Sequence, residues 1–350
     1  MQRTSLVALP AFLSSPQPRS QARYVMGVDG GATKTLAAVL DLHERALHVG
    51  HGGPSNEDSV GPEAAVQALL GAADEAIQRA GIEAGELGAA VLAIAGTNTA
   101  AIAHHVREAR TDAWIVINDV VAAWATATGG GPGVAAIAGT GSNVFGVGEA
   151  GGEVRAWRVG GWGHVLGDEG SGYWLGVQSI KAALRDREAS GPPTALGEAA
   201  MAFFGLPTVE AVAQSVYSKP LTKGEIAAFA IETAKLAEQG DGVACELYEA
   251  GARELGEQIA AVIRQTGLAD GDGAANGFPV GLIGSAYKAG PVFVAPLTRV
   301  IHECAPGASV GRVEMEPVGG SLLLAGRACG LDEAIAPAEL AALIDGAQQA

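Results

Sequence analysis

Apolar residues occur along the chain in short runs separated by glycines, and this pattern predicts strands that alternate with helices. Residues 24–28 and 36–40 are two such runs of strand length, and the glycine-rich turn between them predicts a hairpin. The other elements expected in this half are a strand near 46–49, a helix at 62–79, a strand at 90–95, a helix at 100–109 and a strand at 114–117. This alternation indicates an α/β layer fold.

The same order begins again after the glycine-rich stretch at residues 129–133. Strands are expected at 134–138, 143–147 and 154–159, with a second glycine turn between the first two. The later elements are expected to be helices at 170–188, 194–204, 223–239 and 241–266, and a buried strand at 280–283. Two halves with the same opening indicate two domains, in agreement with a length of 350 residues.

We expect residues 1–22 to form a flexible N-terminal extension, because Pro10 interrupts a short apolar stretch that otherwise looks like a signal peptide. The first domain is expected at residues 23–130. The second, with helical insertions, is expected at residues 131–335. A C-terminal helix at about 336–350 could pack on the first domain.

Composition excludes several classes of protein. A mean hydropathy of +0.23 would suit a membrane protein, but no run approaches the ~18 apolar residues of a spanning helix. With 22 Lys and Arg against 38 Asp and Glu, the net charge is −16, so neither nucleic acid nor a membrane is expected as a partner. Cys245, Cys304 and Cys329 are far apart, which argues against a disulfide framework or a metal cluster and indicates the reducing cytoplasm.

The first glycine turn carries residue types that bind phosphate. Asp29 ends the first strand, and Gly30 and Gly31 let backbone N–H groups approach an anion closely. Thr33 and Lys34 can donate to phosphate oxygens, and a carboxylate beside them suits a hydrated Mg²⁺. The turn is not a Walker A loop, because a strand rather than a helix follows it. A hairpin turn with incidental polar residues is the alternative interpretation.

The second half repeats this arrangement between its first two strands. The residues of this turn are Gly139, Thr140, Gly141 and Ser142. Two such turns at equivalent points of two similar halves suggest a nucleotide phosphate chain clamped between the domains. Residues 146–151 also match the pattern G-x-G-x-x-G, but the strand that follows predicts a hairpin rather than a dinucleotide site.

Asp119 is the candidate catalytic base. It follows the strand at 114–117 and precedes a helix, and so lies at the strand end where open α/β sheets bind ligands. A carboxylate there could accept a proton from an attacking hydroxyl. The alternative is an N-cap, the common role of Asp before a helix.

The stretch at residues 160–174 has the composition of a sugar-binding loop. Its glycines allow close approach to a ligand, Trp162 and His164 offer ring surfaces, and Asp168 and Glu169 are acceptors suited to sugar hydroxyls. Tight packing is the alternative explanation for such a loop.

In their order along the chain, these motifs resemble the BadF/BadG/BcrA/BcrD-type ATPase family of the sugar kinase, Hsp70 and actin superfamily, and most closely the eukaryotic-type N-acetylglucosamine kinases. The resemblance covers residue 24 to about residue 327. It implies two ribonuclease H-like, actin-like ATPase domains with an active-site cleft between them. It also implies that Asp119 is the base and that the glycine turns hold the phosphates of ATP, with Mg²⁺ near Asp29 through water.

The resemblance further implies which residues bind the sugar and the nucleoside. Those expected to line the sugar are Asn56, Asn118, Asp119, Thr140, Gly161, Trp162, Asp168 and Gly172. Gly284 and Ser285 are expected near the adenosine. At Gly172 the related kinases often have Ala, so this chain departs from their pattern beside the 2-substituent of the sugar.

The expected activity is transfer of the γ-phosphoryl group of ATP to the 6-hydroxyl of N-acetylglucosamine or glucosamine, by a cytoplasmic homodimer. The aromatic residues near Trp162 favour the N-acetyl sugar, whereas Glu57 and Asp58 leave room for a free ammonium group. Two alternatives stay open. One is an ATPase that activates an acyl-CoA dehydratase or reductase, for which paired cluster-binding cysteines are lacking. The other is a non-catalytic nucleotide-binding switch.

Overall fold

The first predicted hairpin opens a five-stranded sheet. Strands β1 (Tyr24–Gly30), β2 (Thr35–Asp41) and β3 (Ala46–Gly52) form an antiparallel meander. Strands β4 (Leu87–Ile94) and β5 (Trp114–Asn118) then add in parallel, and the order across the sheet is β3-β2-β1-β4-β5. The carboxyl ends of β1, β4 and β5 therefore share one edge.

The second half repeats this topology. Its strands are β6 (Gly133–Ala138), β7 (Ser142–Ala150), β8 (Glu153–Gly160), β9 (Phe278–Ile283) and β10 (Ala308–Arg312). Their order, β10-β9-β6-β7-β8, is that of the first sheet when read from its other edge, and β9 and β10 add in parallel as β4 and β5 do. Strands β7 and β8 pair antiparallel across Gly151 and Gly152, which both have positive φ. The G-x-G-x-x-G match is therefore part of a hairpin, as predicted.

The structure is a computed structural model that describes residues 7, 9–13, 17–96, 99–111, 113–218, 221–270, 277–331 and 335–349. It divides into two compact units. Unit 1 comprises Met1–Gly133 and Val313–Ala350, and unit 2 comprises Val134–Arg312. The second unit therefore ends earlier than the boundary expected at residue 335, and the chain returns to unit 1.

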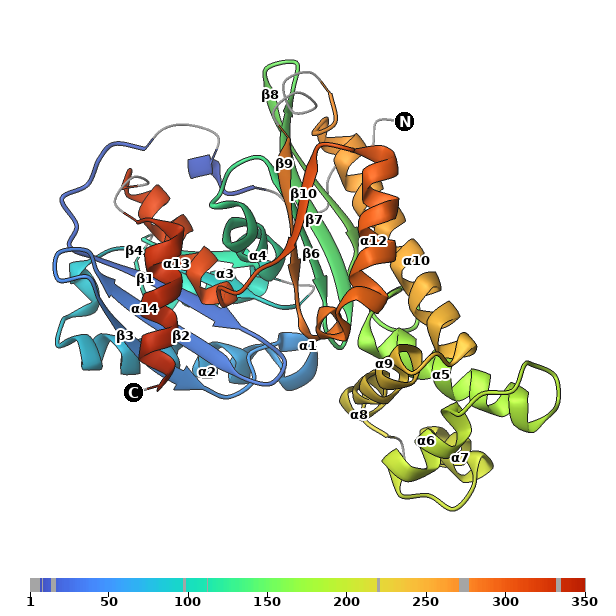
Figure 1. Cartoon of the computed structure of the whole chain (residues 1–350). Coiled ribbons are helices and arrows are strands. Elements are labelled where there is room, and N and C mark those ends of the chain that lie inside the picture. Colours follow the sequence, from blue (N-terminus) through green and yellow to red (C-terminus); the bar gives the residue numbers. More distant parts are fainter. Residues whose placement is uncertain are drawn as a thin grey trace. The chain divides into compact units, whose positions relative to one another are not determined.

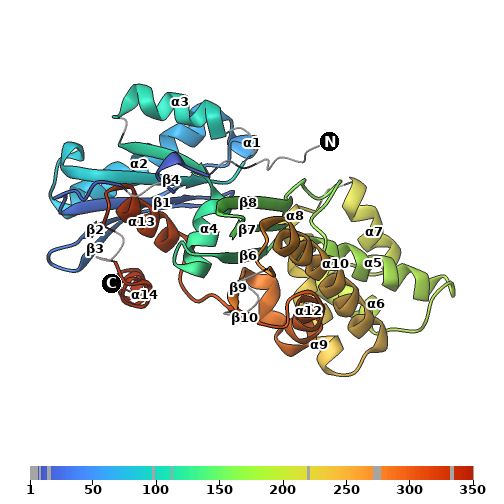
Figure 2. The same cartoon turned by 90° about the horizontal axis from the view of Figure 1, so that it is seen from above.

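Helices cover both faces of the first sheet (Figures 1 and 2). Helices α2 (Pro62–Ala80) and α3 (Thr99–Ala109) bury one apolar face against Met26, Val28 and the alternate residues of neighbouring strands. Helices α4 (Asp119–Thr128) and α13 (Pro317–Ala328) pack on the other face. The short α1 (Glu57–Val60) precedes α2, and the C-terminal α14 (Pro337–Gln349) contacts β3 and α13.

The return of the chain to unit 1 rests on the close packing of α13 against β1. A Cβ atom on Gly27 would lie 2.7 Å from the Leu322 nitrogen, so only glycine allows this approach. The Ser321 hydroxyl donates a 2.9 Å hydrogen bond to the Val28 carbonyl oxygen. Part of the expected flexible extension packs here too, since Leu13 is buried and the Ser20 N–H donates to the Cys329 carbonyl oxygen.

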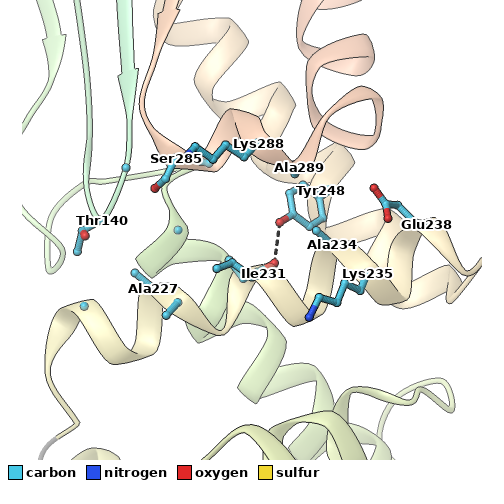
Figure 3. Close-up of a pocket in the computed structure, with 16 residues that line it drawn as sticks. Thr140, Ala227, Ile231, Ala234, Lys235, Glu238, Tyr248, Ser285, Lys288 and Ala289 are labelled. Carbon is cyan, nitrogen blue, oxygen red and sulfur yellow. Dashed lines mark hydrogen bonds between the residues drawn. The ribbon is translucent and has the colours of Figure 1, made fainter. Parts of the chain in front are cut away.

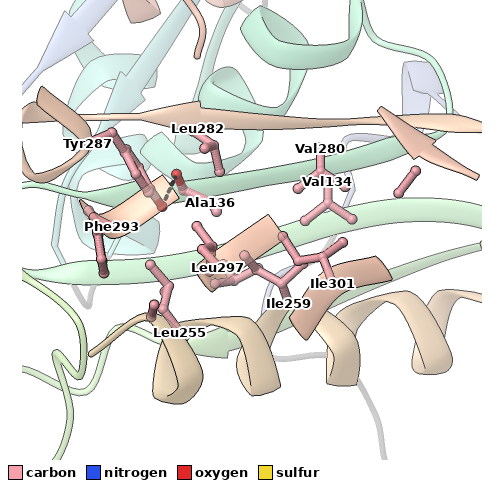
Figure 4. Packing of buried hydrophobic residues seen from close by; sticks show 14 of the residues in the cluster. Val134, Ala136, Leu255, Ile259, Val280, Leu282, Tyr287, Phe293, Leu297 and Ile301 are labelled. Atoms are coloured by element: carbon pink, nitrogen blue, oxygen red, sulfur yellow. Dashed lines mark hydrogen bonds between the residues drawn. The ribbon is translucent and has the colours of Figure 1, made fainter. Parts of the chain in front are cut away.

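The core of unit 2 lies between its sheet and two long helices. Helices α10 (Gly242–Thr266) and α12 (Pro291–Cys304) run side by side (Figure 1). Leu255 and Ile259 of α10 and Leu297 of α12 pack against the strand residues around Val134 and Val280 (Figure 4). All five side chains are fully buried, which makes this cluster the main apolar contribution to the stability of unit 2.

A second helical group follows β8. It consists of α5 (Gly172–Arg187), α6 (Leu196–Phe204), α7 (Val209–Ser218), α8 (Lys223–Ala228) and α9 (Ala230–Glu238). The single helix expected at 223–239 is broken at Phe229, which is buried and contacts the rings of Phe203 and Phe204. Among the residues described, no single helix has the length and apolar character to cross a membrane, although the bent pair α6 and α7 together meets that test.

Candidate active site

The strand register of unit 1 brings two predicted motifs to one edge of the sheet. Gly30 of β1 lies beside Ile94 of β4, and Ile94 lies beside Asn118 of β5. Two strand spacings, together about 10 Å, therefore separate the end of the first glycine turn from the Asn118–Asp119 pair. A ligand of the size of a sugar phosphate can reach both motifs along this edge.

Asn118, rather than Asp119, caps helix α4. Its Oδ1 atom accepts a 3.3 Å hydrogen bond from the Val120 N–H, and its Nδ2 atom donates to the Gly96 carbonyl oxygen at 3.3 Å. Asp119 is the first residue of the helix, where the partial positive charge of the helix terminus favours its carboxylate form. The capping role considered for Asp119 thus belongs to its neighbour. The role of Asp119 as base stays a prediction.

The first glycine turn is joined to the loop that carries Asn56. Within the turn the Gly31 N–H donates to the Lys34 carbonyl oxygen, and the Ser55 N–H donates to the Gly31 carbonyl oxygen, both at 3.0 Å. The Gly31 N–H is therefore used inside the hairpin. The side chains of Thr33 and Lys34 are exposed and remain the donors with free access to an anion.

Asn56 and Asn118 meet around Gly96, the residue that follows β4 by two positions. A Cβ atom on Gly96 would lie 3.7 Å from the Asn56 Oδ1 atom, while Asn118 donates to the carbonyl oxygen of the same glycine. Gly96 has a positive φ of 139°, a conformation that favours glycine. Sequence reasoning missed this residue, although a glycine directly after the strand expected at 90–95 was an available signal.

Asp29 is half-buried at the end of β1, and burial raises its pKa to about 6. The negative charge of Glu316 raises this pKa further, while the ammonium group of Lys34 opposes the shift. Glu316 precedes α13 and forms no side-chain cap bond with it. Two neighbouring carboxylates fit Mg²⁺, which binds proteins through one or two carboxylates and keeps several waters.

In unit 2 the second glycine turn is built around the carboxylate of Asp168. The Asp168 Oδ1 atom accepts a 3.1 Å hydrogen bond from the Ser142 N–H, and a Cβ atom on Gly141 would lie 2.8 Å from it. The Asp168 Oδ2 atom is 2.7 Å from the Lys223 Nζ atom. Asp168 is buried and has a left-handed φ of 64°, a strained conformation for a residue with a side chain.

The predicted sugar loop presents Trp162 on its surface. The Arg158 guanidinium lies over the Trp162 ring at 5.4 Å from its centroid, and His164 packs edge-on against Tyr173. A Cβ atom on Gly161 would lie 2.7 Å from the Asn143 Nδ2 atom, so this glycine allows the loop to pass close to β7. Trp162 is 58% exposed, so part of its ring is accessible to a ligand beside the Arg158 contact.

Gly172 lies where α5, the glycine turn and α8 meet. Its N–H donates a 2.8 Å hydrogen bond to the Gly139 carbonyl oxygen. A Cβ atom here would lie 3.1 Å from that oxygen and 3.2 Å from the Ala227 carbonyl oxygen. Gly172 thus has a packing role in addition to its predicted place beside the sugar.

A cavity of about 540 Å³ opens beside the second glycine turn, wholly within unit 2 (Figure 3). Thr140 and Ser285 lie on its wall, with Ser285 and Lys288 on one side and Ala227 and Ile231 on the opposite side. Its volume lies within the usual range of small-molecule sites. Its lining residues are Gly139, Thr140, Gly172, Gly224, Ala227, Ala228, Ala230, Ile231, Ala234, Lys235, Glu238, Tyr248, Ser285, Ala286, Lys288 and Ala289.

Gly284 lets this cavity approach the second glycine turn. It follows β9, has a φ of 120°, and a Cβ atom on it would overlap the Ala138 carbonyl oxygen. Ser285 is therefore held beside Gly139, as a residue near both nucleoside and phosphates would have to be. The lining residues from α8 and α9 were not predicted, since small apolar residues of a helix look the same at a cavity as in a core.

The predicted site residues thus fall into two groups. Unit 1 carries Asp29, Gly30, Gly31, Thr33, Lys34, Asn56, Asn118 and Asp119. Unit 2 carries Gly139, Thr140, Gly141, Ser142, Gly161, Trp162, Asp168, Gly172, Gly284 and Ser285. Within each group the structure brings residues distant in sequence together.

Comparison with known proteins gives consistent matches. The sequence pattern of the BadF/BadG/BcrA/BcrD ATPase family matches residues 26–325. An N-acetylmuramic acid/N-acetylglucosamine kinase of Clostridium acetobutylicum is 32% identical over 246 residues, covering 69% of this chain and 79% of its own length. An N-acetyl-D-glucosamine kinase of Dictyostelium discoideum is 27% identical over 320 residues, covering 86% and 97%.

A solved structure shares the fold. It comes from Chromobacterium violaceum, is proposed to be an N-acetylglucosamine kinase, and superposes with a TM-score of 0.65 at 25% identity, covering 87% of this chain and all of that one. Together with the two sheets of equivalent order, this likeness confirms the expected fold class, two α/β domains of the actin-like ATPase type.

Proposed function

Because the chain belongs to the BadF/BadG/BcrA/BcrD ATPase family, we propose that it is an ATP-dependent amino-sugar kinase. Two relatives that align over most of their own length are named as kinases of N-acetylglucosamine, and one of them also of N-acetylmuramic acid. The substrate proposed for this chain is N-acetylglucosamine, and the acceptor is its 6-hydroxyl.

The observation that carries the proposal is that Asn118 caps α4 while its neighbour Asp119 places a carboxylate at the carboxyl end of β5. Asn118 accepts the Val120 N–H at the start of α4, so this cap bond belongs to Asn118 and not to Asp119. It stands at the carboxyl edge of β5, on the same edge as the glycine turn after β1. A base beside a phosphate-binding turn is what phosphoryl transfer to a hydroxyl requires.

In the proposed reaction the Asp119 carboxylate accepts the proton of the sugar hydroxyl, whose oxygen attacks the γ-phosphorus of ATP. The bond from that phosphorus to the oxygen bridging it to the β-phosphate breaks, and ADP leaves. Because the transition state of such transfers is loose, positioning and charge stabilisation contribute more than proton removal. Thr33 and Lys34 supply donors from the first turn, and the residues around Thr140 supply them from the second.

Asp29 and Glu316 are the residues we propose to hold Mg²⁺, through its water ligands. Mg²⁺ supplies charge neutralisation at the β- and γ-phosphates when it is bound. The two carboxylates would hold the ion through its waters, and Lys34 would add a second positive charge on the same turn. The raised pKa of Asp29 supports this assignment, because burial and the charge of Glu316 destabilise its ionised form and a bound cation would stabilise it.

The choice of sugar depends on what faces its 2-substituent. An N-acetyl group requires an apolar surface and a hydrogen-bond partner, whereas a protonated amine requires a carboxylate. Trp162 and Tyr173 provide ring surfaces, and the Asp168 carboxylate is already paired with Lys223. The side chain of Asp58 lies outside the described part of the chain. These contacts favour the N-acetyl sugar over glucosamine.

Coupled detection of ADP with a panel of hexoses and amino sugars tests the proposal. We expect N-acetylglucosamine to stimulate ATP turnover and the product to be its 6-phosphate. ATP turnover that no sugar changes would contradict the kinase assignment. A preference for glucosamine of more than about tenfold in kcat/KM, or about 1.4 kcal/mol, would overturn the choice of sugar alone.

A further inference from the structure

Asp168 is a buried carboxylate whose two oxygens have separate partners. Its side chain is 5% exposed. The Oδ1 atom accepts from the Ser142 N–H of the glycine turn at 3.1 Å, and the Oδ2 atom lies 2.7 Å from the Lys223 Nζ atom. An ionised carboxylate this far from water is stable only with such partners, and removing one leaves an uncompensated charge.

Lys223 comes from a different part of unit 2, and its place is fixed by its own helix. It is the first residue of α8, whose preceding residue, Thr222, forms a reciprocal capping box with Glu225. Gly224 and Ala227 of the same helix line the 540 Å³ cavity. The Lys223 side chain, 37% exposed, also lies 5.9 Å from the centroid of the Tyr173 ring.

The ion pair therefore connects three features of the proposed kinase. Asp168 belongs to the predicted sugar loop, Ser142 to the second glycine turn, and Lys223 to the helix α8 that lines the 540 Å³ cavity. Asp168 also has a left-handed backbone conformation, which costs free energy and persists only where surrounding contacts enforce it. The close approach of its carboxylate to Gly141 and its ion pair with Lys223 are contacts that hold this conformation.

We propose that Lys223 is a positioning residue that holds the Asp168 carboxylate against the glycine turn, so that Asp168 can accept hydrogen bonds from the sugar. This inference rests on the proposed function, because it assigns Asp168 to the sugar. Each carboxylate oxygen keeps a second lone pair after binding Ser142 or Lys223. Without the lysine, the carboxylate turns away from the turn toward water, and its acceptor positions are no longer fixed for the sugar hydroxyls.

The test compares Lys223→Met with Lys223→Arg and with Lys181→Met, which removes an exposed lysine of α5 in the same unit. We expect Lys223→Met to raise the KM for the sugar by about tenfold or more, which is about 1.4 kcal/mol. The KM for ATP should change by less than about threefold. Arginine restores the charge and should return the sugar KM to within about threefold of the wild type, and Lys181→Met should leave every parameter unchanged.

A second readout does not depend on catalysis. Hydrogen exchange of peptides covering residues 139–143 and 163–171 should quicken in Lys223→Met and stay unchanged in Lys181→Met, because the Ser142 N–H loses a fixed acceptor. If Lys223→Met does not fold, Lys223→Gln, which keeps a donor and removes the charge, replaces it under the same criteria.

The outcomes separate the two proposals. A wild-type protein that phosphorylates no sugar refutes the proposed function, whatever the exchange data show. A kinase whose Lys223→Met variant melts at a lower temperature, yet keeps its sugar KM, overturns the positioning role and leaves the ion pair as a purely structural contact.

Discussion

At the scale of single residues, Asp119 and Asn118 show how a helix terminus can carry both a cap and a reactive group. We predict that Asp119→Asn lowers kcat by at least about 100-fold, the lower end expected for a general base. Sugar affinity and thermal stability should change little, because the cap bond from Val120 goes to Asn118. Steady-state kinetics and calorimetric sugar titration measure these two effects separately.

Asp241 is the matched control for this substitution. It is an aspartate that does cap a helix, because its Oδ1 atom accepts from the Ala244 N–H at 2.9 Å at the start of α10. Asp241→Asn keeps an oxygen for this cap but loses the Oδ2 acceptor of the Thr194 hydroxyl and the Ala195 N–H, so it should lower the melting temperature and leave kcat unchanged. If Asp119→Asn behaved like Asp241→Asn, with near-full turnover and lost stability, the base assignment would be wrong.

Asp41 provides a prediction about pH. Hydrogen bonds from the Arg23 guanidinium, supported by the N–H groups of His43 and Glu44, lower the pKa of this buried carboxyl to about 2. A depressed folded-state pKa stabilises the protein above the unfolded value, near 4, and this stabilisation is lost as the pH falls toward 2. Asp41→Asn should therefore lower the free energy of unfolding by about 2 kcal/mol at pH 7, given about 1.4 kcal/mol per unit of pKa.

Denaturant unfolding at several pH values measures this loss. The difference between wild type and Asp41→Asn should shrink steadily below pH 4. Glu44→Gln removes the other carboxylate that Arg23 contacts, an exposed one at 2.8 Å, and should cost less than about 1 kcal/mol. A gap between wild type and Asp41→Asn that is constant from pH 7 to pH 2 would show that the carboxylate charge does not contribute.

At the scale of secondary structure, the elements with a clear period and clear ends were predictable. The helix expected at 62–79 is observed as α2, Pro62–Ala80. Its ends were predictable because Pro62 begins it and Gly81 follows its last residue. The break at Phe229 could not be predicted, because the local sequence pattern is helical on both sides of it. The ring contacts of Phe229 with Phe203 and Phe204 arise only in the folded unit. Helix α13 was not predicted either, because its glycines lower helix propensity and are required by packing against distant segments.

The contact of α5 with α8 allows a prediction from two glycines one turn apart. A Cβ atom on Gly176 would overlap the Ile226 carbonyl oxygen, whereas one on Gly172 needs a shift of only a few tenths of an ångström from two carbonyl oxygens. Gly176→Ala should therefore destabilise the protein by about 3 kcal/mol. Gly172→Ala should cost less than about 1 kcal/mol, because the gain in helix propensity offsets the strain.

Chemical denaturation of the two variants tests this contrast, and each serves as the control of the other. Both replace glycine by alanine in the same helix, Gly172 at its first residue and Gly176 one turn further along. Equal losses of stability would contradict the close approach of α8 to Gly176. A larger loss for Gly172→Ala would mean that α8 approaches Gly172 more closely than Gly176, which would contradict this packing.

The candidate site was predictable where local chemistry marks it. The glycine turns, the Asn118–Asp119 pair and the loop around Trp162 each combine special residue types within a few positions. Lys223 and Glu316 carry no such mark, because their partners Asp168 and Asp29 lie far away in the sequence and only the fold brings them near. Sequence reasoning therefore missed these long-range pairs of charges, as it missed Gly96 and the cavity-lining residues of α8 and α9.

At the scale of the whole molecule, the two units differ in the number of chain segments that form them. Unit 2 is one continuous segment, Val134–Arg312, whereas unit 1 needs Val313–Ala350 as well as the N-terminal part. The repeat of strands, turns and helices was visible in the sequence. The return of the chain to unit 1 was expected only for the C-terminal helix at about 336–350, because nothing in the local pattern at Pro317–Ala328 reveals that it covers β1 and α4.

This discontinuity predicts an asymmetric effect of truncation. A chain that ends at residue 312 loses α13, and with it the cover over Gly27 and the hydrogen bond from Ser321 to Val28. The exposed sheet face of unit 1 then lacks the apolar burial that stabilises it, so β1 and β4 should lose protection in hydrogen exchange. Strand β6 and helix α10 should keep theirs, because their core lies wholly within unit 2.

A chain ending at residue 331 is the control. It keeps α13 and loses α14, and its β1 amides should stay protected. Full protection of β1 in the shorter chain would mean that α13 does not complete unit 1.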